Sequence, residues 1–91
     1  MKAKIWNKKW WVKGQEEKEL VERLTRNLLN AGFKIVGECE KVFEPQGFTK
    51  LWLLAESHLA LHTFPEEDKS YIELSSCNKE KYKIFCRLLK K

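Results

Sequence analysis

The feature that most constrains the fold is a pair of apolar segments separated by only two polar residues. Residues 50–55 are apolar apart from Lys50, Glu56-Ser57 interrupts the pattern, and the next residues alternate between two faces. In this second segment Leu59, Leu61 and Thr63 share one face, while His58, Ala60, His62 and Phe64 share the other. The pattern predicts two β-strands joined by a tight break. We expect the Ser57 hydroxyl and the His62 imidazole, five residues on, to lie near one surface of the sheet.

The rest of the chain predicts three further strands and two helices. Strands are expected at residues 4–12, 33–42 and 71–76, and helices at 15–31 and 79–90, where apolar residues recur at helical spacing. Acidic residues near the start of the first helix interact favourably with the helix dipole, and Gly32 is expected to end this helix. Asn78 is the expected N-cap of the second helix. We summarise the expected order as β-α-β-β-β-α.

These elements predict an α+β fold, a two-layer α/β sandwich in which a mainly antiparallel sheet carries two helices on one face. The 91 residues are expected to form a single domain, and a hydrophobic content of 43% is too high for a disordered chain. A chain of this length cannot easily cover the other face of the sheet. We therefore predict a homodimer with contact between the two sheets.

Composition argues against several functional classes. The net charge of +5 is spread along the chain among 13 acidic residues, so we expect no nucleic-acid partner. Three irregularly spaced cysteines fit neither a disulfide scaffold nor a zinc site. His58 and His62 would stand roughly 13 Å apart on a strand, too far for one zinc ion. No apolar run approaches a membrane span of about 20 residues and no export signal is seen, so we expect a cytoplasmic protein without a membrane partner.

Ser57, His62 and Cys77 are the candidate catalytic residues. Each also has a more ordinary structural interpretation. A serine at a strand start is usually a turn residue, a strand histidine is more often part of a hydrogen-bonded framework, and a cysteine after an apolar strand is most often a small buried side chain. A cysteine-hydrolase pair of Cys77 with His58 or His62 is formally possible, but no local signature supports it.

Three motifs resemble one known family. Glu56-Ser57-His58-Leu59-x-x-His62-Thr63-x-Pro65-Glu66 resembles the self-processing segment of the prokaryotic S-adenosylmethionine decarboxylases, which are small pyruvoyl enzymes of polyamine synthesis. Phe43-x-Pro45-x-Gly47-x-Thr49 resembles the family's Phe-x-Pro-x-Gly-x-Ser/Thr loop. Ile72-Glu73-Leu74-x-x-Cys77 resembles its strand that ends in Thr-Cys, with Glu73 for Asp and Ser76 for Thr. The similarity covers about residues 16 to 90.

The resemblance implies an autocatalytic proenzyme. Ser57 would attack the carbonyl of Glu56, and His62 would remove the Cα proton of Ser57, so that the chain breaks into residues 1–56 and 57–91. Ser57 would become a pyruvoyl group, the only cofactor implied, which accepts electrons when S-adenosylmethionine loses CO₂. The product is the decarboxylated S-adenosylmethionine used in spermidine synthesis.

The resemblance also assigns roles to the remaining candidates. Cys77 would return a proton as general acid, and Thr49 would position groups during processing. Phe43 would stack on the adenine of the substrate, and Glu66 would accept hydrogen bonds from its ribose. The resemblance implies no metal.

The sequence departs from the family at both ends and leaves other functions open. The family's Gly-x-His strand is absent from residues 4–12, the chain stops soon after the last helix, and Phe64 replaces a common Trp. A pyruvoyl-dependent ornithine or arginine decarboxylase of the same fold would share the processing residues. An uncleaved, non-catalytic relative is a third reading, and a basic nucleic-acid module is a distant fourth.

Overall fold

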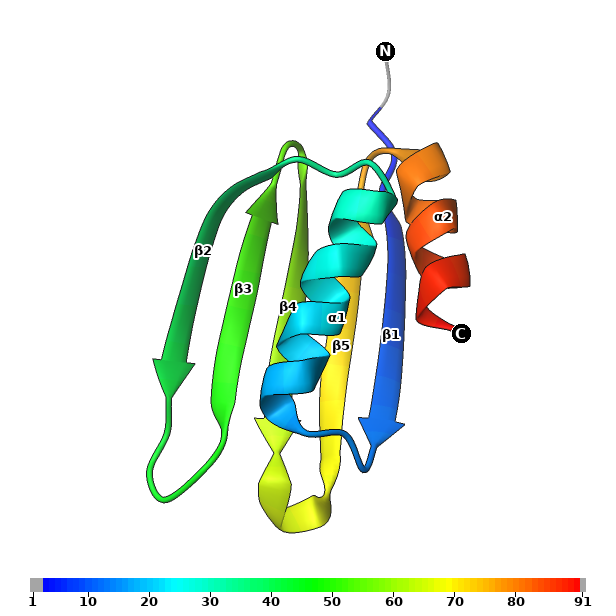
Figure 1. Ribbon diagram of the computed structural model, residues 1–91. Coiled ribbons are helices and arrows are strands. Elements are labelled where there is room, and N and C mark those ends of the chain that lie inside the picture. Colours follow the sequence, from blue (N-terminus) through cyan, green and yellow to red (C-terminus); the bar gives the residue numbers. More distant parts are fainter. Residues whose placement is uncertain (1–2, 91) are drawn as a thin grey trace.

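The computed structural model describes residues 3–90 and contains five strands, two α-helices and one short 3₁₀ helix. Figure 1 shows these elements. In chain order they are β1 (Trp6–Lys13), α1 (Glu17–Asn30), β2 (Ile35–Val42), β3 (Phe48–Leu54), β4 (Ser57–Phe64), η1 (Pro65–Glu67), β5 (Lys69–Ser76) and α2 (Lys79–Leu89). All five predicted strand segments are found. The summary order β-α-β-β-β-α is wrong by one strand, because β3 and β4 are separate strands and the observed order is β-α-β-β-β-β-α.

The strands form one antiparallel sheet in the order β1-β5-β4-β3-β2. Consecutive strands from β2 to β5 are neighbours, whereas β1 pairs with β5 and forms the edge of the sheet opposite β2. The single irregularity among the paired residues is a register shift between Ile35 and Gly37 of β2. The two-layer α+β sandwich with a mainly antiparallel sheet is therefore confirmed.

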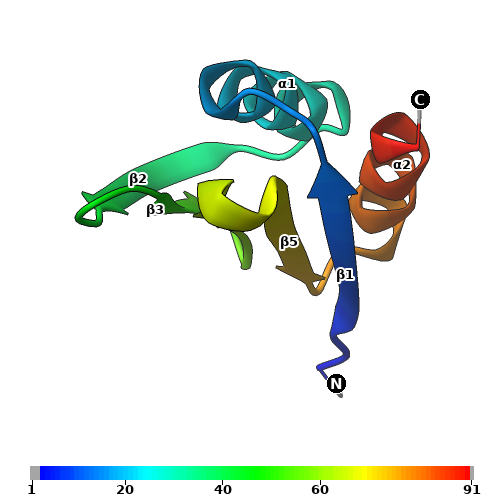
Figure 2. The ribbon, with the colours of Figure 1, turned by 90° about the horizontal axis from the view of Figure 1, so that it is seen from below.

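Both helices lie on the same face of the sheet, as Figure 2 shows. The alternation along β4 is confirmed, because Leu59 and Leu61 are fully buried beneath the helices. The helices contribute Leu20, Leu24, Leu28 and Ala31 from α1 and its C-cap, and Phe85 and Leu89 from α2. These residues form one hydrophobic cluster with Trp52, Leu54, Ile72 and Leu74 of the sheet.

The helix ends follow the sequence signals. Glu16 caps α1 by accepting the backbone N–H of Lys18 at 2.6 Å, and Asn78 caps α2 by accepting that of Lys81 at 3.0 Å. Gly32, with φ of +95°, ends α1, and the backbone N–H of Phe33 donates to the carbonyl of Leu28 at 3.0 Å. These caps fix where the chain leaves each helix for the sheet.

The other face of the sheet carries exposed apolar side chains. Leu51 and Leu53 of β3, Phe64 of β4 and Trp11 of β1 are between 36% and 56% exposed there. We call this surface the open face. Its apolar character is what the sequence predicted for a sheet with helices on one side only. No helix within residues 3–90 is long and apolar enough to cross a membrane.

Candidate active site

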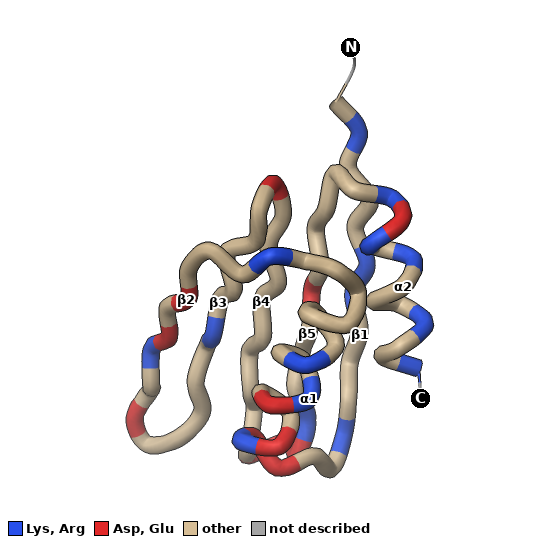
Figure 3. The backbone as a smooth tube through the Cα atoms, turned by 45° about the horizontal axis from the view of Figure 1, so that its top comes forward, with Lys and Arg blue, Asp and Glu red and all other residues tan. Residues whose placement is uncertain are grey.

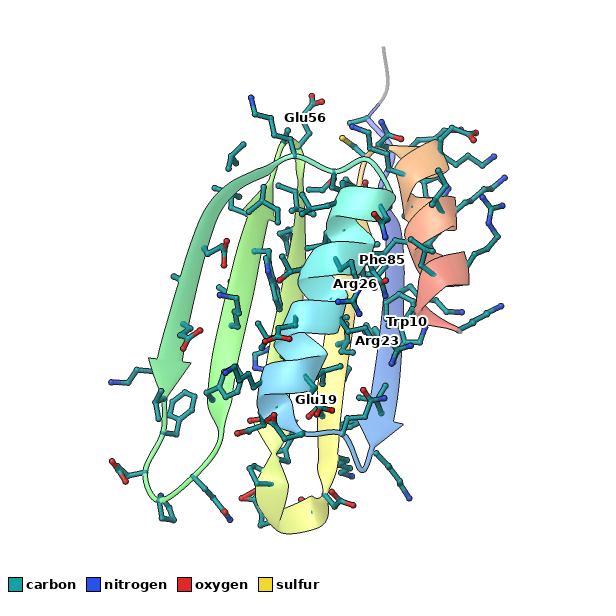
Figure 4. The ribbon with its side chains drawn as sticks, viewed as in Figure 1. Trp10, Glu19, Arg23, Arg26, Glu56 and Phe85 are labelled. Carbon is teal, nitrogen blue, oxygen red and sulfur yellow. The ribbon has the colours of Figure 1, made fainter. Side chains whose placement is uncertain are left out.

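A two-residue loop joins β3 to β4 and contains the predicted cleavage position. Leu54 pairs with Ser57 across the hairpin, so only Ala55 and Glu56 form the loop. Glu56 has a φ of +62°, a left-handed conformation that costs a non-glycine residue about 1–3 kcal/mol. Figure 4 shows Glu56 at the tip of this hairpin. The peptide bond before Ser57 thus lies next to a strained backbone residue.

The hydroxyl of Ser57 points to the helix-covered face, where it contacts the next strand. Ser57 Oγ donates a hydrogen bond to Ser76 Oγ at 2.8 Å, and the two residues are directly paired between β4 and β5. Ser76 is 1% exposed, and its Oγ also accepts the backbone N–H of Asn78 at 2.9 Å. Ser76 was not among the sequence candidates, although it stands where the family motif has Thr. The hydroxyl that would act as nucleophile is therefore held by a buried neighbour.

Cys77 lies beside the same loop. Its thiol donates a hydrogen bond to the carbonyl oxygen of Glu56, with an Sγ···O distance of 3.2 Å. Cys77 follows the last residue of β5, and the pairing of Ser57 with Ser76 brings the end of β5 to the start of β4. The structure thus brings the candidate Cys77 next to Glu56 and Ser57.

His62 is separated from this group. The expectation that Ser57 and His62 lie near one surface is wrong, because residues five apart on a strand point to opposite faces. They are also about 16 Å apart along the strand at a rise of about 3.3 Å per residue. His62 lies on the open face, where its Nδ1 is 2.9 Å from the Thr49 hydroxyl of β3. Thr49 and His62 therefore form a second, separate pair.

A polar and aromatic network surrounds His62 on the open face. The ring of Tyr71 lies 6.0 Å from the ring of His62, and the Tyr71 hydroxyl donates to Glu73 Oε1 at 2.9 Å. Asn7 Nδ2 donates to Glu73 Oε2 at 3.0 Å. The hydrogen bonds from Asn7 and Tyr71 hold the pKa of Glu73 below its usual value, while burial and Glu73 raise the pKa of Tyr71. Sequence analysis missed this network because it depends on the pairing of β1 with β5.

The two predicted substrate contacts lie at the far end of the sheet from the cleavage loop. Phe43, which is 48% exposed, is the first residue of the loop between β2 and β3, and Glu66 belongs to η1. In Figure 1 both segments are at the lower end, whereas the β3–β4 hairpin is at the upper end. Within one chain the structure does not bring Phe43 or Glu66 to Ser57.

The open face contains a pocket of about 470 Å³ beside β2 and β3. Its lining includes Gly37, Cys39, Leu51, Leu53 and His58, and is mostly apolar. His58 therefore lines the pocket rather than meeting His62 or Cys77. Among residues 3–90 there is no group of three or more His, Cys, Asp or Glu side chains placed to hold a metal ion.

The candidate residues consequently form two groups at opposite ends of β4. The hairpin group of Glu56, Ser57 and Cys77 contains a serine hydroxyl, the carbonyl of the preceding residue and a thiol donor. The open-face group of Thr49 and His62 contains an imidazole that could accept a proton. Within one chain the two groups are therefore held apart, on opposite faces of the sheet.

Comparison with known proteins gives one consistent family. The family model described as S-adenosylmethionine decarboxylase matches residues 14–91. An S-adenosylmethionine decarboxylase proenzyme of Prochlorococcus marinus is 38% identical over 66 residues, which is 72% of this chain and 53% of the relative. The proenzyme of Symbiobacterium thermophilum is 46% identical over 46 residues, which is 50% of this chain and 35% of the relative. This chain therefore spans about half or less of these relatives' length.

The fold has a solved counterpart. The crystal structure of the adenosylmethionine decarboxylase from Aquifex aeolicus superposes with a TM-score of 0.78 at 20% sequence identity. The match covers 98% of this chain and 79% of that chain. At this identity the likeness establishes the shared fold.

Proposed function

Because this chain belongs to the S-adenosylmethionine decarboxylase family, we propose that it is a self-processing, pyruvoyl-dependent decarboxylase. Its substrate would be S-adenosylmethionine, and its product would serve polyamine synthesis. The word proenzyme in the names of the relatives supports a precursor that matures by cleavage. The observation that carries the proposal is the hairpin group, in which a serine hydroxyl, a strained carbonyl residue and a thiol meet at one peptide bond.

The hairpin group supports the first step of maturation. Ser57 Oγ attacks the Glu56 carbonyl carbon, the C–N bond breaks, and the hydroxyl proton passes to the released Ser57 nitrogen, so that the acyl group moves from nitrogen to oxygen as an ester. The Cys77 thiol, 3.2 Å from the Glu56 oxygen, stabilises negative charge that develops there. The strained conformation of Glu56 is released as the peptide bond breaks.

The second step needs a base. Removal of the Ser57 Cα proton lets the Cβ–O bond break and releases Glu56 as a carboxylate. The resulting enamine takes up water and loses ammonia, which leaves a pyruvoyl group at position 57. When formed, this group supplies an electron sink for the loss of CO₂. Cys77 already lies beside this position, so it fits the role of a proton donor to the product.

We assign the base to His62 of a second copy. In one chain His62 is about 16 Å along the strand from Ser57 and on the other face. A homodimer that packs two open faces with opposed ends would bring His62 and Thr49 of one copy to the hairpin of the other. The same arrangement would bring Phe43 and Glu66 towards that hairpin as substrate contacts. The exposed Trp11, Leu51, Leu53 and Phe64 supply apolar surface for such a contact.

Intact mass spectrometry of the purified protein under denaturing conditions tests the cleavage. We expect two fragments, residues 1–56 and a fragment starting at position 57 with the mass of a pyruvoyl rather than a serine terminus. Ser57→Ala should remain intact. Ser75→Ala is the matched control, because Ser75 precedes Ser76 on β5 but its Oγ accepts from Asn7 on the open face. A wild-type chain that stays whole after long incubation contradicts the proposal.

A mixing experiment tests the role of the second copy. Ser57→Ala and His62→Ala chains, distinguished by a mass tag, are unfolded together and refolded. If His62 acts across the dimer, the His62→Ala chain is cleaved in the mixture, although neither variant is cleaved alone. Cleavage of His62→Ala alone would show that another group is the base.

The substrate is tested separately on the cleaved protein. Release of CO₂ from labelled S-adenosylmethionine, with ornithine and arginine as competitors, distinguishes the adenosylmethionine decarboxylase from an amino-acid decarboxylase of the same fold. Phe43→Ala should weaken use of S-adenosylmethionine, because an aromatic face interacts with both the adenine and the sulfonium charge. An unchanged KM in this variant argues against the assigned contact.

A further inference from the structure

A basic groove lies between the edge strand β1 and helix α2, away from the cleavage hairpin and on the helix-covered side of the sheet. It has a volume of about 270 Å³. Four cationic residues line it, namely Lys8 from β1 and Lys83, Arg87 and Lys90 from α2, together with the aromatic residues Trp10 and Tyr82. We call it the β1–α2 groove. Figure 3 shows Lys and Arg gathered along these two elements.

Within residues 3–90 no acidic side chain neutralises the positive charge of the groove. Asp and Glu are absent from its lining, and none of the four cations forms an ion pair with any carboxylate of residues 3–90. Helix α2 carries one acidic residue, Glu80, in its first turn, and its last turn carries Arg87. Four like charges around one small space repel one another, and an anion between them would relieve that repulsion.

One thiol, that of Cys86, also lines the groove. Burial raises the pKa of this thiol. The hydrogen bond with Tyr82 and the positive charges of Lys8 and Lys90 act in the opposite direction. Because the pKa is raised, the thiol is neutral at pH 7. It therefore does not compete with an anionic ligand for these cations.

The aromatic wall of the groove is held in place. The Trp10 ring packs edge-on against Phe85, with centroids 6.0 Å apart and an interplanar angle of 61°. Phe85 is fully buried, so it anchors Trp10 at the junction of β1 and α2, as Figure 4 shows. The volume of about 270 Å³ is just under the roughly 300–1,000 Å³ common for small-molecule sites. The groove is thus suited to one ring and one charged group.

We propose that the β1–α2 groove binds a small phosphate ester that carries an aromatic ring, such as a mononucleotide. The guanidinium of Arg87 and the ammonium groups of Lys8, Lys83 and Lys90 take the phosphate, for which Arg and Lys are the usual partners. Trp10 and Tyr82 contact the ring. The groove is distinct from the hairpin group and the open face, so this proposal stands whether or not the chain is cleaved.

Residue-resolved NMR of the purified full chain tests the proposal with three probes: AMP, inorganic pyrophosphate and adenosine. We expect AMP to shift the Trp10 indole N–H and the amides of residues 82–90, with saturation, and to bind at least about tenfold more tightly than adenosine, since charge-assisted bonds to phosphate are lost in adenosine. Pyrophosphate should bind more weakly than AMP and leave the Trp10 indole unmoved. Equal binding of AMP and pyrophosphate would overturn the ring contact.

Matched charge reversals decide whether the site is specific. Lys83→Glu/Arg87→Glu should weaken AMP binding by about tenfold or more, because two phosphate partners become repulsive. The control Lys34→Glu/Lys41→Glu changes the net charge equally at exposed positions outside the groove and should alter the affinity less than about twofold. Equal weakening by both pairs would overturn the site as non-specific charge attraction. Tighter binding of a single-stranded oligonucleotide than of AMP would overturn the small-ligand assignment in favour of nucleic acid.

Discussion

The thiol of Cys77 lies 3.2 Å from the carbonyl oxygen of Glu56, the carbonyl that Ser57 would attack. A donor at this position stabilises the oxygen as it gains negative charge. We therefore expect Cys77→Ala to slow self-cleavage by about tenfold, less than for a strong oxyanion donor because a thiol donates weakly. Cys77→Ser, which keeps a donor, should cleave faster than Cys77→Ala. Time courses by intact mass measure both rates, with Cys86→Ala as the control, because Cys86 lies on α2 away from the hairpin group and the open face. Equal rates for all three variants would exclude the donor role.

Ser76 holds the Ser57 hydroxyl at 2.8 Å and is 1% exposed. Ser76→Ala removes this partner and the acceptor for the Asn78 N–H, so we expect the free energy of unfolding to fall by about 1–2 kcal/mol. Cleavage should also slow, because Ser57 loses the contact that orients it. Ser76→Thr keeps the hydroxyl, so its cleavage rate should be closer to that of the wild type than the rate of Ser76→Ala is. Its stability should recover less, because the added methyl group must fit into a buried site. Urea unfolding and mass time courses separate the two effects, and cleavage at the wild-type rate in Ser76→Ala would rule out an orienting role.

Glu56 and Asp68 are the two non-glycine residues with positive φ among residues 3–90, at +62° and +53°. Replacing either with glycine relieves a left-handed conformation, and we expect each folded chain to gain up to about 1 kcal/mol. Only Glu56→Gly should also slow cleavage, since only there does the strain adjoin the scissile bond. The two variants thus form a matched pair, measured by thermal unfolding and by cleavage rate. A Glu56→Gly chain that cleaves as fast as Asp68→Gly would show that strain does not assist the reaction.

Glu73 gives stability a defined pH dependence. The hydrogen bonds from Asn7 and Tyr71 lower its pKa in the folded state below 4.5, so the ionised carboxylate is stabilised by folding. This contribution is present above the unfolded-state pKa and is lost as the pH falls through the folded-state pKa. Glu73→Gln should therefore be less stable than the parent at pH 7, by less than about 1 kcal/mol because the site is partly exposed, and equally stable near pH 2.

Unfolding by urea at several pH values, with both chains carrying Ser57→Ala to keep them whole, measures this difference. The pH dependence of stability in Glu38→Gln is measured for comparison. Glu38 is a carboxylate on the other, helix-covered side of the sheet, where it forms an ion pair with Lys50 at 2.8 Å. A difference between Glu73→Gln and its parent that stays constant from pH 7 to pH 2 would contradict the assigned linkage.

Local sequence patterns predicted the elements because each depends on near neighbours. The alternation from His58 to Phe64 identified the buried face of β4, and the Asn78 cap located the start of α2. The family motif singled out Cys77 as a candidate, whereas its contact with the Glu56 carbonyl became visible only in the structure. Side chains alternate between the two faces of a strand, so Ser57 and His62, which are five residues apart, must point to opposite faces. The expectation that they share a surface did not take this alternation into account.

Other features depend on pairings between distant parts of the chain. The contact of Ser57 with Ser76 follows from the register of β4 against β5, and the Asn7–Glu73 bond from that of β1 against β5. The β1–α2 groove exists because β1 joins the sheet at the edge next to α2. No local pattern in residues 6–13 predicts which strand they pair with, so these sites became visible only in three dimensions.

The order β1-β5-β4-β3-β2 has a mechanical consequence for a nick between Glu56 and Ser57. A piece beginning at Ser57 would supply β4 and β5, and both flanking strands, β3 and β1, would belong to the other piece. The shorter piece would thus be hydrogen-bonded on both sides, through the antiparallel pairs β5–β1 and β4–β3. Cleavage would therefore create a new chain end while the sheet stays whole, because separating the two pieces would break the hydrogen bonds of both strand pairs.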